Sequence, residues 1–395
     1  MPDVWDLVVV GAGPAGAAAA LSALQQRPQA RVLLLDRSAF PRDKSCGDGI
    51  APHAVDQLHH LGVAGVLADR VPVRRLRLRS PSGVEVTQDL RRPDYVVPRE
   101  VFDARLVAAA VARGAVLRRH TVRRLERLPD RTGTGGAVVD GDLVARAVVG
   151  ADGANGVVRR LLGLPRQPDG AVAVAVRGYA ASPAGPPEQF IALDGRQWPA
   201  YAWRFDAGDG TSNVGFGMLL PMLREAGRER DGGGDGRAGG RAELHGRLAE
   251  LLPGVEASRL VSHKLPLSTR RPAQPRGRVL LAGDAMSLIN PMTGEGIFYA
   301  LLSGRLAGAA AVTAQDPGRA YAGELRRELG RHLRHTSALA RLTRRPSVID
   351  AGLVACGRSP GAFDALVQVG LGDGLITRPL LAGLAREAAR RLVSR

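Results

Sequence analysis

The sequence is poor in cysteine and in aromatic residues. Its 395 residues include two cysteines, Cys46 and Cys356, which stand far apart and belong to no paired motif. This spacing argues against a disulfide framework and against a thiolate metal site, so we predict a cytoplasmic protein without a bound metal. Aromatic residues make up only 4% of the chain, so a strand on which several of them gather is informative.

Long hydrophobic runs are also missing. No stretch approaches the roughly 20 apolar residues that a membrane-spanning helix needs. The apolar segment "LVVVGAGPAGAAAAL" near the N-terminus lacks the basic start of a signal peptide, and its glycines and proline favour a strand, a turn and a helix. With 45% hydrophobic and 24% charged residues, the composition is that of a soluble globular protein of two or three domains.

Lysine is nearly absent, although the formal net charge is +17. The basic charge is almost entirely arginine, since Lys44 and Lys264 are the lysines of the chain. The arginines are scattered through periodic segments, without a basic tail and without the aromatic alternation that suits stacked bases. We therefore predict no nucleic-acid partner. An attraction to anionic substrates or to an anionic membrane surface stays open.

Residues 4–36 carry a nucleotide-binding pattern. A buried strand, a tight turn, a helix and a second buried strand follow one another, with three glycines in G-x-G-x-x-G spacing. Such glycines permit the turn, the approach of a pyrophosphate and close packing of helix on strand, and an acidic residue ending the second strand can accept bonds from a ribose. The predicted binding residues here are Gly11, Gly13, Pro14, Ala15, Gly16, Asp36 and Arg37.

The rest of the pattern predicts an α/β fold with a discontinuous, Rossmann-like nucleotide-binding domain. A β-rich insertion is expected at about 72–98, and a Gly/Arg/Asp-rich loop at 227–241. Long alternating strands favour an antiparallel sheet that covers a ligand. In chain order the predicted parts are the first nucleotide-binding part (1–170), the antiparallel-sheet substrate domain (171–268), the completing nucleotide-binding part (269–318) and a helical C-terminal region (319–395).

Two later motifs narrow the choice of nucleotide cofactor. Asp152 and Gly153 follow a strand, and Gly283 and Asp284 precede a Pro-Met-Thr-Gly-Glu-Gly turn that leads into a helix. With these motifs the sequence resembles the FAD-dependent oxidoreductases of the aromatic-hydroxylase type. The resemblance implies that Asp284 binds the ribityl chain of FAD. It also implies that the turn presents backbone N–H groups to the flavin N1/O2 edge, where a helix N-terminus stabilises the anionic reduced flavin.

Within that superfamily the sequence is similar to the geranylgeranyl reductase family, which reduces isoprenoid double bonds. Four segments carry the similarity in order: "RDKSCGDGIAPHAVDQLHHLGV", "VPREVFDARL", "PAYAWRFD" and "NPMTGEGIFYALLSGRLAG". The similarity covers most of residues 5–310, and Asp206 stands where the family usually has Pro or Gly. The further FAD-binding residues that it implies are Cys46, Gly47, Arg99, Asp152, Gly283, Asp284, Pro291, Gly294, Glu295, Gly296 and Ile297.

The same resemblance implies a substrate cavity beside the flavin. Cys46 would lie near the reacting edge, where its thiol would orient the substrate or deliver a proton. In the alternative, Gly47 and Gly49 make a bend and Cys46 only packs. Tyr201 and Trp203 alternate on one strand, so they share a face that would line the cavity. We assign catalysis to Cys46, Tyr201 and Trp203, and substrate binding to Gly49, Tyr201, Trp203, Phe205 and Pro291.

The predicted function is an FAD-dependent reductase that acts on C=C bonds of an isoprenoid or similar hydrophobic substrate by hydride transfer from flavin N5. The electron donor is NADPH or another reductant, because no second dinucleotide fold is evident. A phosphate head group on the substrate stays open. So does peripheral membrane contact through the basic tail "RPLLAGLAREAARRLVSR", which would equally pack on the FAD domain. Nothing in the sequence indicates the oligomeric state.

Other functions on the same fold stay open. A flavin-dependent monooxygenase of natural-product biosynthesis, either a hydroxylase or an epoxidase, is the main alternative, because oxygen activation depends more on cavity shape than on a motif. A halogenase fits less well, since the sequence lacks a Trp-x-Trp-x-Ile-Pro segment. A non-catalytic protein that keeps FAD for structure is a third class. The intact phosphate, ribityl and flavin-edge motifs argue against it.

Overall fold

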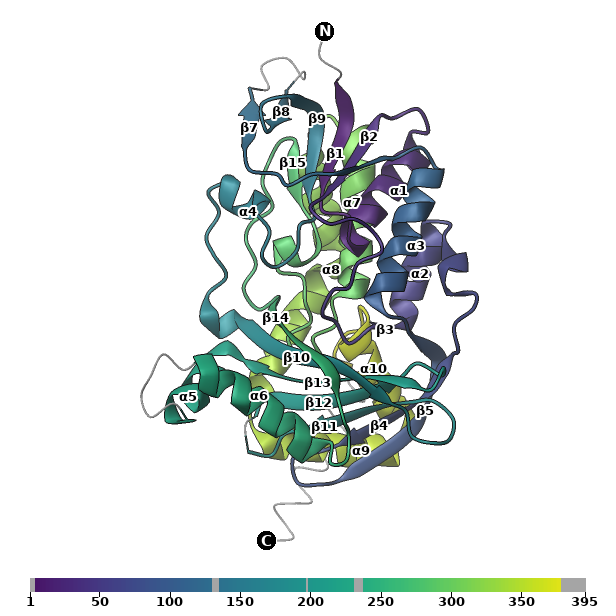
Figure 1. Cartoon of the computed structure of the whole chain (residues 1–395), viewed down its shortest axis with the longest axis vertical. Helices are drawn as coiled ribbons and strands as arrows, with labels where there is room; N and C mark the ends of the chain where they lie inside the picture. The colour runs from purple at the N-terminus through teal and green to yellow at the C-terminus, as the bar shows by residue number, and fades with distance from the viewer. Residues whose placement is uncertain (1–3, 130–134, 197, 231–236, 378–395) are drawn as a thin grey trace.

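Two β-sheets, each with its own helices, form the part of the chain that the structure describes (Figure 1). The computed structural model describes residues 4–129, 135–196, 198–230 and 237–377. The first sheet lies at the end of the molecule near the N-terminus, and the second lies below it in Figure 1. Each sheet takes strands from separate parts of the chain, so the chain crosses between them repeatedly.

The first sheet has a parallel centre. Within the described residues its strand order is β6-β2-β1-β9-β8-β7, and β15 pairs with β9. β2, β1, β9 and β15 are runs of Val, Leu and Ala that are buried almost throughout, as expected of parallel strands covered on both faces. The strands are β1 (Trp5–Val10), β2 (Val32–Asp36), β6 (Val116–Arg119), β7 (Leu125–Leu128), β8 (Gly136–Val139), β9 (Leu143–Gly150) and β15 (Val279–Leu281).

β15 completes this sheet late in the chain. It pairs in parallel with residues 148–150 of β9, on the side away from β1. The predicted discontinuous nucleotide-binding fold is therefore confirmed. The strand, turn, helix and strand predicted in residues 4–36 are also confirmed, as β1, α1 (Pro14–Gln26) and β2.

The second sheet is antiparallel except where β11 runs parallel to β4. Its order in the described residues is β14-β10-β13-β12-β11-β4-β5-β3, so the predicted antiparallel sheet is confirmed and extended. The strands predicted as an insertion at 72–98 belong to this sheet. Its strands are β3 (Gly49–Ile50), β4 (Val73–Arg79), β5 (Glu85–Val96), β10 (Val172–Ala181), β11 (Glu188–Leu193), β12 (Ala200–Asp206), β13 (Thr211–Leu219) and β14 (Ser258–Pro266).

Helices α5 (Leu220–Arg230) and α6 (Arg237–Leu251) cover one face of the second sheet. Leu223, Leu244 and Leu248 pack there against inward residues of the sheet. The prediction of a loop over 227–241 is wrong for the helical residues at both of its ends, and residues 231–236 lie outside the described residues. The packing of these leucines stabilises helix in spite of the glycines nearby.

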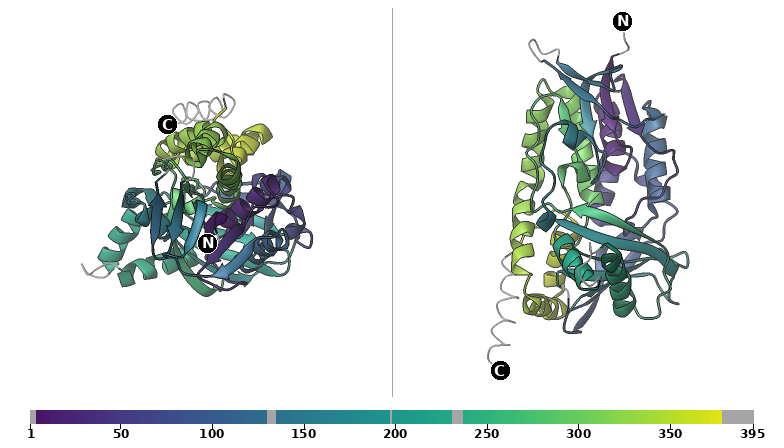
Figure 2. Two further views of the ribbon diagram at one scale, coloured as in Figure 1. Left: turned by 90° about the horizontal axis from the view of Figure 1, so that it is seen from above. Right: turned by 60° about the vertical axis from the view of Figure 1, so that its left-hand side comes forward.

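The C-terminal region is helical, as predicted, as far as Leu371. Helix α8 (Pro317–Leu342) runs beside both sheets in Figure 2, and α9 (Pro346–Arg358) and α10 (Pro360–Leu371) pack on the β4–β5 end of the second sheet. The basic tail discussed above lies outside the described residues. The remaining helices are α2 (Pro52–His60), α3 (Arg99–Ala112), α4 (Val158–Leu161) and α7 (Ile297–Thr313). Within the described part of the chain no helix combines the length and apolar content that a membrane crossing requires.

Helices α1 and α7 touch at backbone distance. A Cβ at Gly304 would lie 2.1 Å from the carbonyl oxygen of Ala15, and one at Gly308 would lie 2.0 Å from that of Ala19. Because the glycines leave no side chain between the helices, the start of α1 lies directly against α7. This contact fixes the glycine-rich loop of the first sheet relative to the turn that precedes α7.

We expect Gly308→Ala to lower the free energy of unfolding by about 1–3 kcal/mol, the usual range for an overpacked core. The matched control is Gly323→Ala on the exposed side of α8, where no atom lies within 4 Å of the added methyl group. That change removes a helix-interior glycine and should raise stability by up to ~1 kcal/mol. Urea unfolding of both variants measures the difference, and equal effects would contradict the close helix contact.

Candidate functional site

The carboxyl ends of the parallel strands mark the site. Val10, Leu35, Gly150 and Leu281 stand next to one another in the strand register. Open α/β sheets bind ligands just outside such ends. The chain leaves β2 at this edge and reaches the second sheet at Gly49, so the connecting loop lies between the two sheets.

Two glycines of the first turn are required by the fold. Gly11 has a φ of 98°, and a Cβ there would lie 2.4 Å from the carbonyl oxygen of Ala151. A Cβ at Gly16 would lie 1.8 Å from the carbonyl oxygen of Gly11. Gly13 is the N-cap of α1 and Pro14 follows it, with no side chain of the described residues capping the helix. The N–H groups at the start of α1 are therefore available to an anion.

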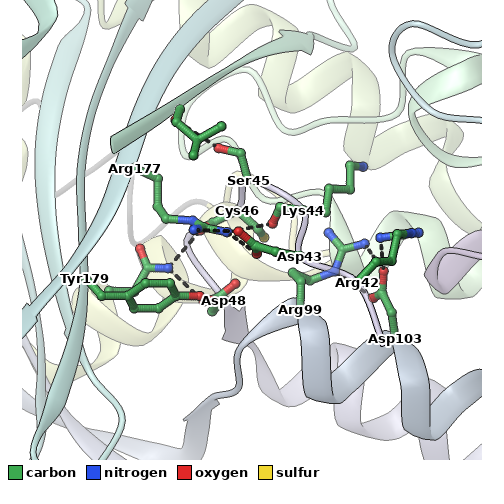
Figure 3. A network of polar contacts seen from close by, with 12 residues as sticks. Arg42, Asp43, Lys44, Ser45, Cys46, Asp48, Arg99, Asp103, Arg177 and Tyr179 are labelled. Carbon is green, nitrogen blue, oxygen red and sulfur yellow. Dashed lines mark hydrogen bonds and ion pairs between the residues drawn. The ribbon is translucent and has the colours of Figure 1, made fainter. Parts of the chain in front are cut away.

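Two arginines, Arg42 and Arg99 (drawn with Asp103 in Figure 3), face this helix start. The Cβ position of Gly13 lies 3.7 Å from Nη2 of both. Arg99 is 4% exposed and donates two hydrogen bonds of 2.7 Å to Asp103, which also accepts one of 3.0 Å from Arg42. Arg42 also lies near Asp36, so both guanidinium groups have carboxylate partners, and the guanidinium groups are what approach the helix N-terminus. This is the chemistry of a diphosphate site.

Asp36 connects the parts of this anion cradle, by which we mean Arg42, Arg99 and the start of α1. Its Oδ2 accepts a hydrogen bond of 2.9 Å from the N–H of Ala12, and its Oδ1 accepts one of 2.9 Å from Ser38. Nη2 of Arg42 lies 3.7 Å from Oδ2. The predicted contact of Asp36 with a ribose stays a prediction, as does that of Arg37, whose side chain is exposed.

Asp284 and the turn before α7 lie together. Lys44 Nζ is 3.4 Å from Asp284 Oδ2, and the Cβ position of Gly296 is 3.7 Å from Asp284 Oδ1. Burial raises the pKa of Glu295 to about 7, and its Oε1 accepts a hydrogen bond of 2.7 Å from the N–H of Phe298. One N–H group at the start of α7 is thus satisfied by the turn itself, and the predicted role of the others at the flavin edge stays a prediction.

Gly283 joins this turn to the glycine-rich loop. It has a φ of 60°, and its N–H donates a hydrogen bond of 2.9 Å to Ser303 Oγ on α7. A Cβ at Gly283 would lie 3.1 Å from the Cβ of Ala15. Ile297, the first residue of α7, is 5% exposed, whereas Pro291 is partly exposed. The structure therefore places the two predicted halves of the cofactor site in contact.

His263 on β14 faces the same region. Its pKa is lowered to about 4, because burial and the positive charges of Lys44 and Arg99 outweigh the attraction of Asp284. Its Nε2 is buried without a hydrogen-bond partner among the described residues. No sequence motif marks this histidine, since it enters the site only through the strand register of β14 on β10.

Asp152 lies beside Gly11, at the glycine-rich loop that follows β1. Its Oδ2 accepts hydrogen bonds of 2.6 Å from Val157 and 2.9 Å from Val158, so it caps the short helix α4. Its Oδ1 is buried and has no partner in the described part of the chain, and burial raises its pKa. Its Cα would lie 2.8 Å from a Cβ at Gly11. Asp152 thus borders the predicted phosphate site, and a contact with FAD stays a prediction.

The cysteine loop rests on the aromatic strand β12. A Cβ at Gly47 would lie 3.3 Å from Phe205 and 3.5 Å from Trp203, and one at Gly49 would lie 3.9 Å from Phe205. The side chain of Cys46 is partly exposed. Burial raises the pKa of its thiol, while the positive charges of Arg99 and Lys44 oppose that shift. The thiol is therefore protonated at neutral pH and has two cations within electrostatic reach.

The same strand reaches the turn before α7. The ring centroids of Tyr201 and Trp203 are 6.0 Å apart, and those of Trp203 and Phe205 are 6.4 Å apart. The Tyr201 hydroxyl donates a hydrogen bond to the carbonyl oxygen of Thr293. A Cβ at Gly294 would lie 3.0 Å from that hydroxyl. The structure thus brings the predicted cysteine loop, aromatic strand and glycine turn to one place.

Several polar residues of the site were missed from the sequence. One of them is Asp103, which the i, i+4 spacing from the predicted Arg99 could have revealed. Asp94 has no such signal: it is 1% exposed, and burial beside Glu295 raises its pKa to about 8. The other missed residues are Arg42, Asp43, Lys44, Asp48, Arg177, Tyr179, Asn213 and His263.

These residues fit FAD. An anion cradle stands at one end of the site, and a thiol, an aromatic wall and a glycine turn stand at the other, as an extended dinucleotide with a central diphosphate requires. Oδ1 of Asp152 and Nε2 of His263 are buried polar atoms that lack partners in the described residues. The described residues contain nine such atoms; these two lie beside Gly11 and beside the Lys44–Asp284 pair, where polar groups of FAD would be able to satisfy them.

Comparisons with known proteins bear on the family and the fold of the chain. Residues 5–195 match the family described as FAD binding domain. The chain is 36% identical to the menaquinone reductase of Mycolicibacterium smegmatis, over 76% of this chain and 75% of that protein. It is 33% identical to digeranylgeranylglycerophospholipid reductase 1 of Methanopyrus kandleri, over 78% of this chain and 81% of that protein. Its fold is similar to that of a geranylgeranyl bacteriochlorophyll reductase-like protein of Thermoplasma acidophilum, with a TM-score of 0.77 at 19% identity, over 98% and 97% of the two chains.

Arg42→Ala tests the anion cradle. Loss of one charge-assisted hydrogen bond costs about 1.5–3 kcal/mol, so we expect the Kd for FAD to rise by at least ~10-fold. Titration of the apoprotein with FAD measures this. Arg105→Ala removes an arginine of α3 that pairs with the exposed Asp69, and it should leave the Kd unchanged. An unchanged Kd for Arg42→Ala would contradict the cradle.

His263→Gln tests the electrostatics. The pKa of His263 is about 4 in the folded protein against 6.5 for the ordinary side chain. Because the unfolded chain then binds the extra proton, this group makes the protein less stable as the pH falls from 6.5 towards 4. The melting temperature of the variant should therefore exceed that of the wild type at pH 5 and equal it at pH 7.5. Thermal unfolding at both pH values, with the exposed His59→Gln as control, measures the difference, and its absence at pH 5 would contradict this account.

Proposed function

Because the chain belongs to the geranylgeranyl reductase family of FAD-dependent oxidoreductases, we propose that it reduces carbon–carbon double bonds of an isoprenoid substrate. The observation that carries the proposal is the meeting of the Cys46 loop, the aromatic strand β12 and the turn before α7. Two relatives are named for the reduction of menaquinone and of digeranylgeranylglycerophospholipid, and the second name contains two geranylgeranyl chains.

The chain's own residues would hold FAD at its diphosphate and at its ribityl chain. Arg42, Arg99 and the uncapped start of α1 bind the diphosphate, and Asp284 faces the ribityl chain. When bound, reduced FAD would supply a hydride, which carries the two electrons and one of the two hydrogens that such a reduction requires. Lys44 already pairs with Asp284, so it stands where it can hold negative charge at that end of the cofactor.

Cys46 is the proton donor in this proposal. Since burial raises the pKa of its thiol, the Sγ–H proton is retained at neutral pH until a stronger base receives it. The proton passes from Sγ to the substrate carbon that the reduction leaves electron-rich. The positive charges of Arg99 and Lys44 then stabilise the thiolate that remains. Solvent restores the proton.

The aromatic strand excludes water and positions the chain of the substrate. Trp203 is 6% exposed and Phe205 contacts the cysteine loop, so both present apolar surface beside the thiol. The hydroxyl of Tyr201 is engaged with Thr293, and burial raises its pKa well above the ordinary value. Tyr201 therefore holds the glycine turn rather than donating the proton.

The proposal also covers the electron donor, the head group of the substrate and contact with a membrane. The electron donor is NADPH or another reductant that binds transiently. The substrate carries an anionic head group, for which exposed arginines such as Arg331, Arg334 and Arg341 on α8 offer positive charge. The same charges would favour peripheral contact with an anionic membrane that holds the substrate.

Anaerobic turnover tests the proposal. Protein reduced with one equivalent of dithionite is mixed with a geranylgeranyl phospholipid, the oxidised flavin spectrum is followed, and the product masses are measured by mass spectrometry. The expected result is reoxidation without oxygen and a product two hydrogens heavier for each reduced double bond. Reoxidation that requires oxygen, with an oxygen atom added to the product, would place the protein among the monooxygenases.

Cys46→Ser tests the thiol. Loss of a general acid typically lowers turnover by about 100-fold or more, so we expect a kcat reduced by that factor and a Kd for FAD within ~2-fold of the wild type. Cys356→Ser is the matched control, because Cys356 is buried in the α9 cluster away from the site and its loss should leave kcat unchanged. A Cys46→Ser enzyme as fast as the wild type would show that the thiol only packs.

A further inference from the structure

Side chains of the second sheet bind the cysteine loop (Figure 3). Arg177 on β10 is 1% exposed and makes two hydrogen bonds to Asp43, of 2.6 and 3.1 Å. The same guanidinium donates to the carbonyl oxygens of Lys44, at 2.9 Å, and of Cys46, at 3.2 Å. A single buried side chain therefore holds three residues of the loop.

Asn213 on β13 makes a second attachment. Its Nδ2 donates hydrogen bonds of 2.8 Å to the carbonyl oxygen of Cys46 and to Oδ2 of Asp48. Its Oδ1 accepts a hydrogen bond of 2.9 Å from Nε1 of Trp203. Asn213 is 1% exposed, so these bonds do not compete with bulk water. One amide thus joins the cysteine loop to the aromatic wall.

Asp48 makes the third attachment. It is fully buried with a φ of 60°, and its Oδ2 also accepts a hydrogen bond of 2.6 Å from the hydroxyl of Tyr179. Its own carbonyl oxygen accepts one of 2.9 Å from the N–H of Val97. The left-handed backbone at Asp48 costs energy, and the three hydrogen bonds from Asn213, Tyr179 and Val97 hold it in place.

The consequence concerns the distance between the thiol and the aromatic wall. The carbonyl group of Cys46 receives hydrogen bonds from Asn213 and from Arg177, so the backbone of Cys46 is fixed by the sheet rather than by its own loop. The indole of Trp203 is fixed by the same Asn213 amide. A change at Asn213 would therefore move Cys46 and Trp203 relative to each other.

We infer that Asn213 is a positioning residue for the reduction, acting with Asp48 and Arg177 to set Cys46 against Trp203. The inference rests on the proposed role of Cys46 and deepens it. Asn213 touches neither of the reacting atoms. It determines whether the Sγ–H bond and the apolar wall face the same part of the substrate.

The carboxylate of Asp48 has a further effect on the thiol. Burial raises the pKa of Asp48 to about 6, against the hydrogen bonds of Tyr179 and Asn213 and the charges of Arg177 and Arg99. Its negative charge in turn raises the pKa of the Cys46 thiol. Asp48→Asn keeps an oxygen acceptor for Tyr179 and Asn213 but removes the charge. Comparison of this variant with the Asn213 variants separates the effect of the Asp48 charge on the thiol from the effect of the position of Cys46.

The experiment uses the full-length holoenzyme in a Cys356→Ser background, so that one thiol remains. Asn213→Ala removes the amide, and Asn213→Asp keeps an acceptor for Trp203 while losing the Nδ2 donor. Ser212→Ala is the matched control: Ser212 is the adjacent, fully buried residue of β13, and its Oγ donates a hydrogen bond of 2.6 Å to Asp206 on the other face. Three quantities are measured: kcat and KM, the melting temperature, and the pH profile of Cys46 alkylation by iodoacetamide.

Asn213→Ala should lower kcat by about 10–100-fold with KM within ~2-fold, since misplacement by about 1 Å costs up to that factor. Cys46 should be alkylated several-fold faster, because its loop is released. Asn213→Asp should show the same direction of change. Asp48→Asn should shift the alkylation profile to lower pH, because the thiol loses a neighbouring negative charge. Ser212→Ala should change neither kcat nor alkylation, even if its melting temperature falls equally.

Unchanged kcat and unchanged alkylation in Asn213→Ala would overturn the inference, and so would an equal response of Ser212→Ala. The alkylation profile does not depend on any substrate. If the wild type fails to reduce isoprenoids while Asn213→Ala still releases the thiol, the proposed function fails and the positioning contact stands.

Discussion

An ion pair between the buried Arg177 and the half-exposed Asp43 joins the second sheet to the loop that leaves the first. Arg177 belongs to the second sheet and is 1% exposed, whereas Asp43 lies in the loop that leaves the first sheet. If the loop moved away, this guanidinium would lose its two hydrogen bonds to Asp43 and those to the carbonyl oxygens of Lys44 and Cys46. These bonds fix the conformation of the loop between the sheets, and Cys46 is one of the residues that they fix.

Charge is distributed unevenly around this loop, and the distribution matches the proposed chemistry. Arg42 and Arg99 both pair with Asp103 at the start of α1, where a diphosphate would bind, and Arg42 also lies 3.7 Å from Asp36. Farther along, Lys44 pairs with Asp284 beside the turn before α7. The thiol lies between these positive charges and the apolar surface of β12. A group placed in this way can give up a proton and tolerate the negative charge that remains.

Local sequence patterns predicted the first sheet well, because its strands are continuous apolar runs and its turn needs glycine at Gly11 and Gly16. They also predicted β12 and the turn before α7. They could not predict that β4 joins the second sheet beside β11, since that pairing depends on contacts between distant segments. Arg177 and Asn213 were missed for the same reason. Each looks like an ordinary strand residue until the strand register brings it under the cysteine loop.

The central claim is that Cys46, the aromatic strand and the glycine turn surround the reactive end of FAD. A crystal structure of the protein with FAD bound tests this most directly. The account predicts the isoalloxazine ring between the Cys46 loop and residues 291–296, with Trp203 facing the substrate side. An isoalloxazine ring bound elsewhere, with Cys46 out of contact and the Arg177 and Asn213 bonds unchanged, would contradict it.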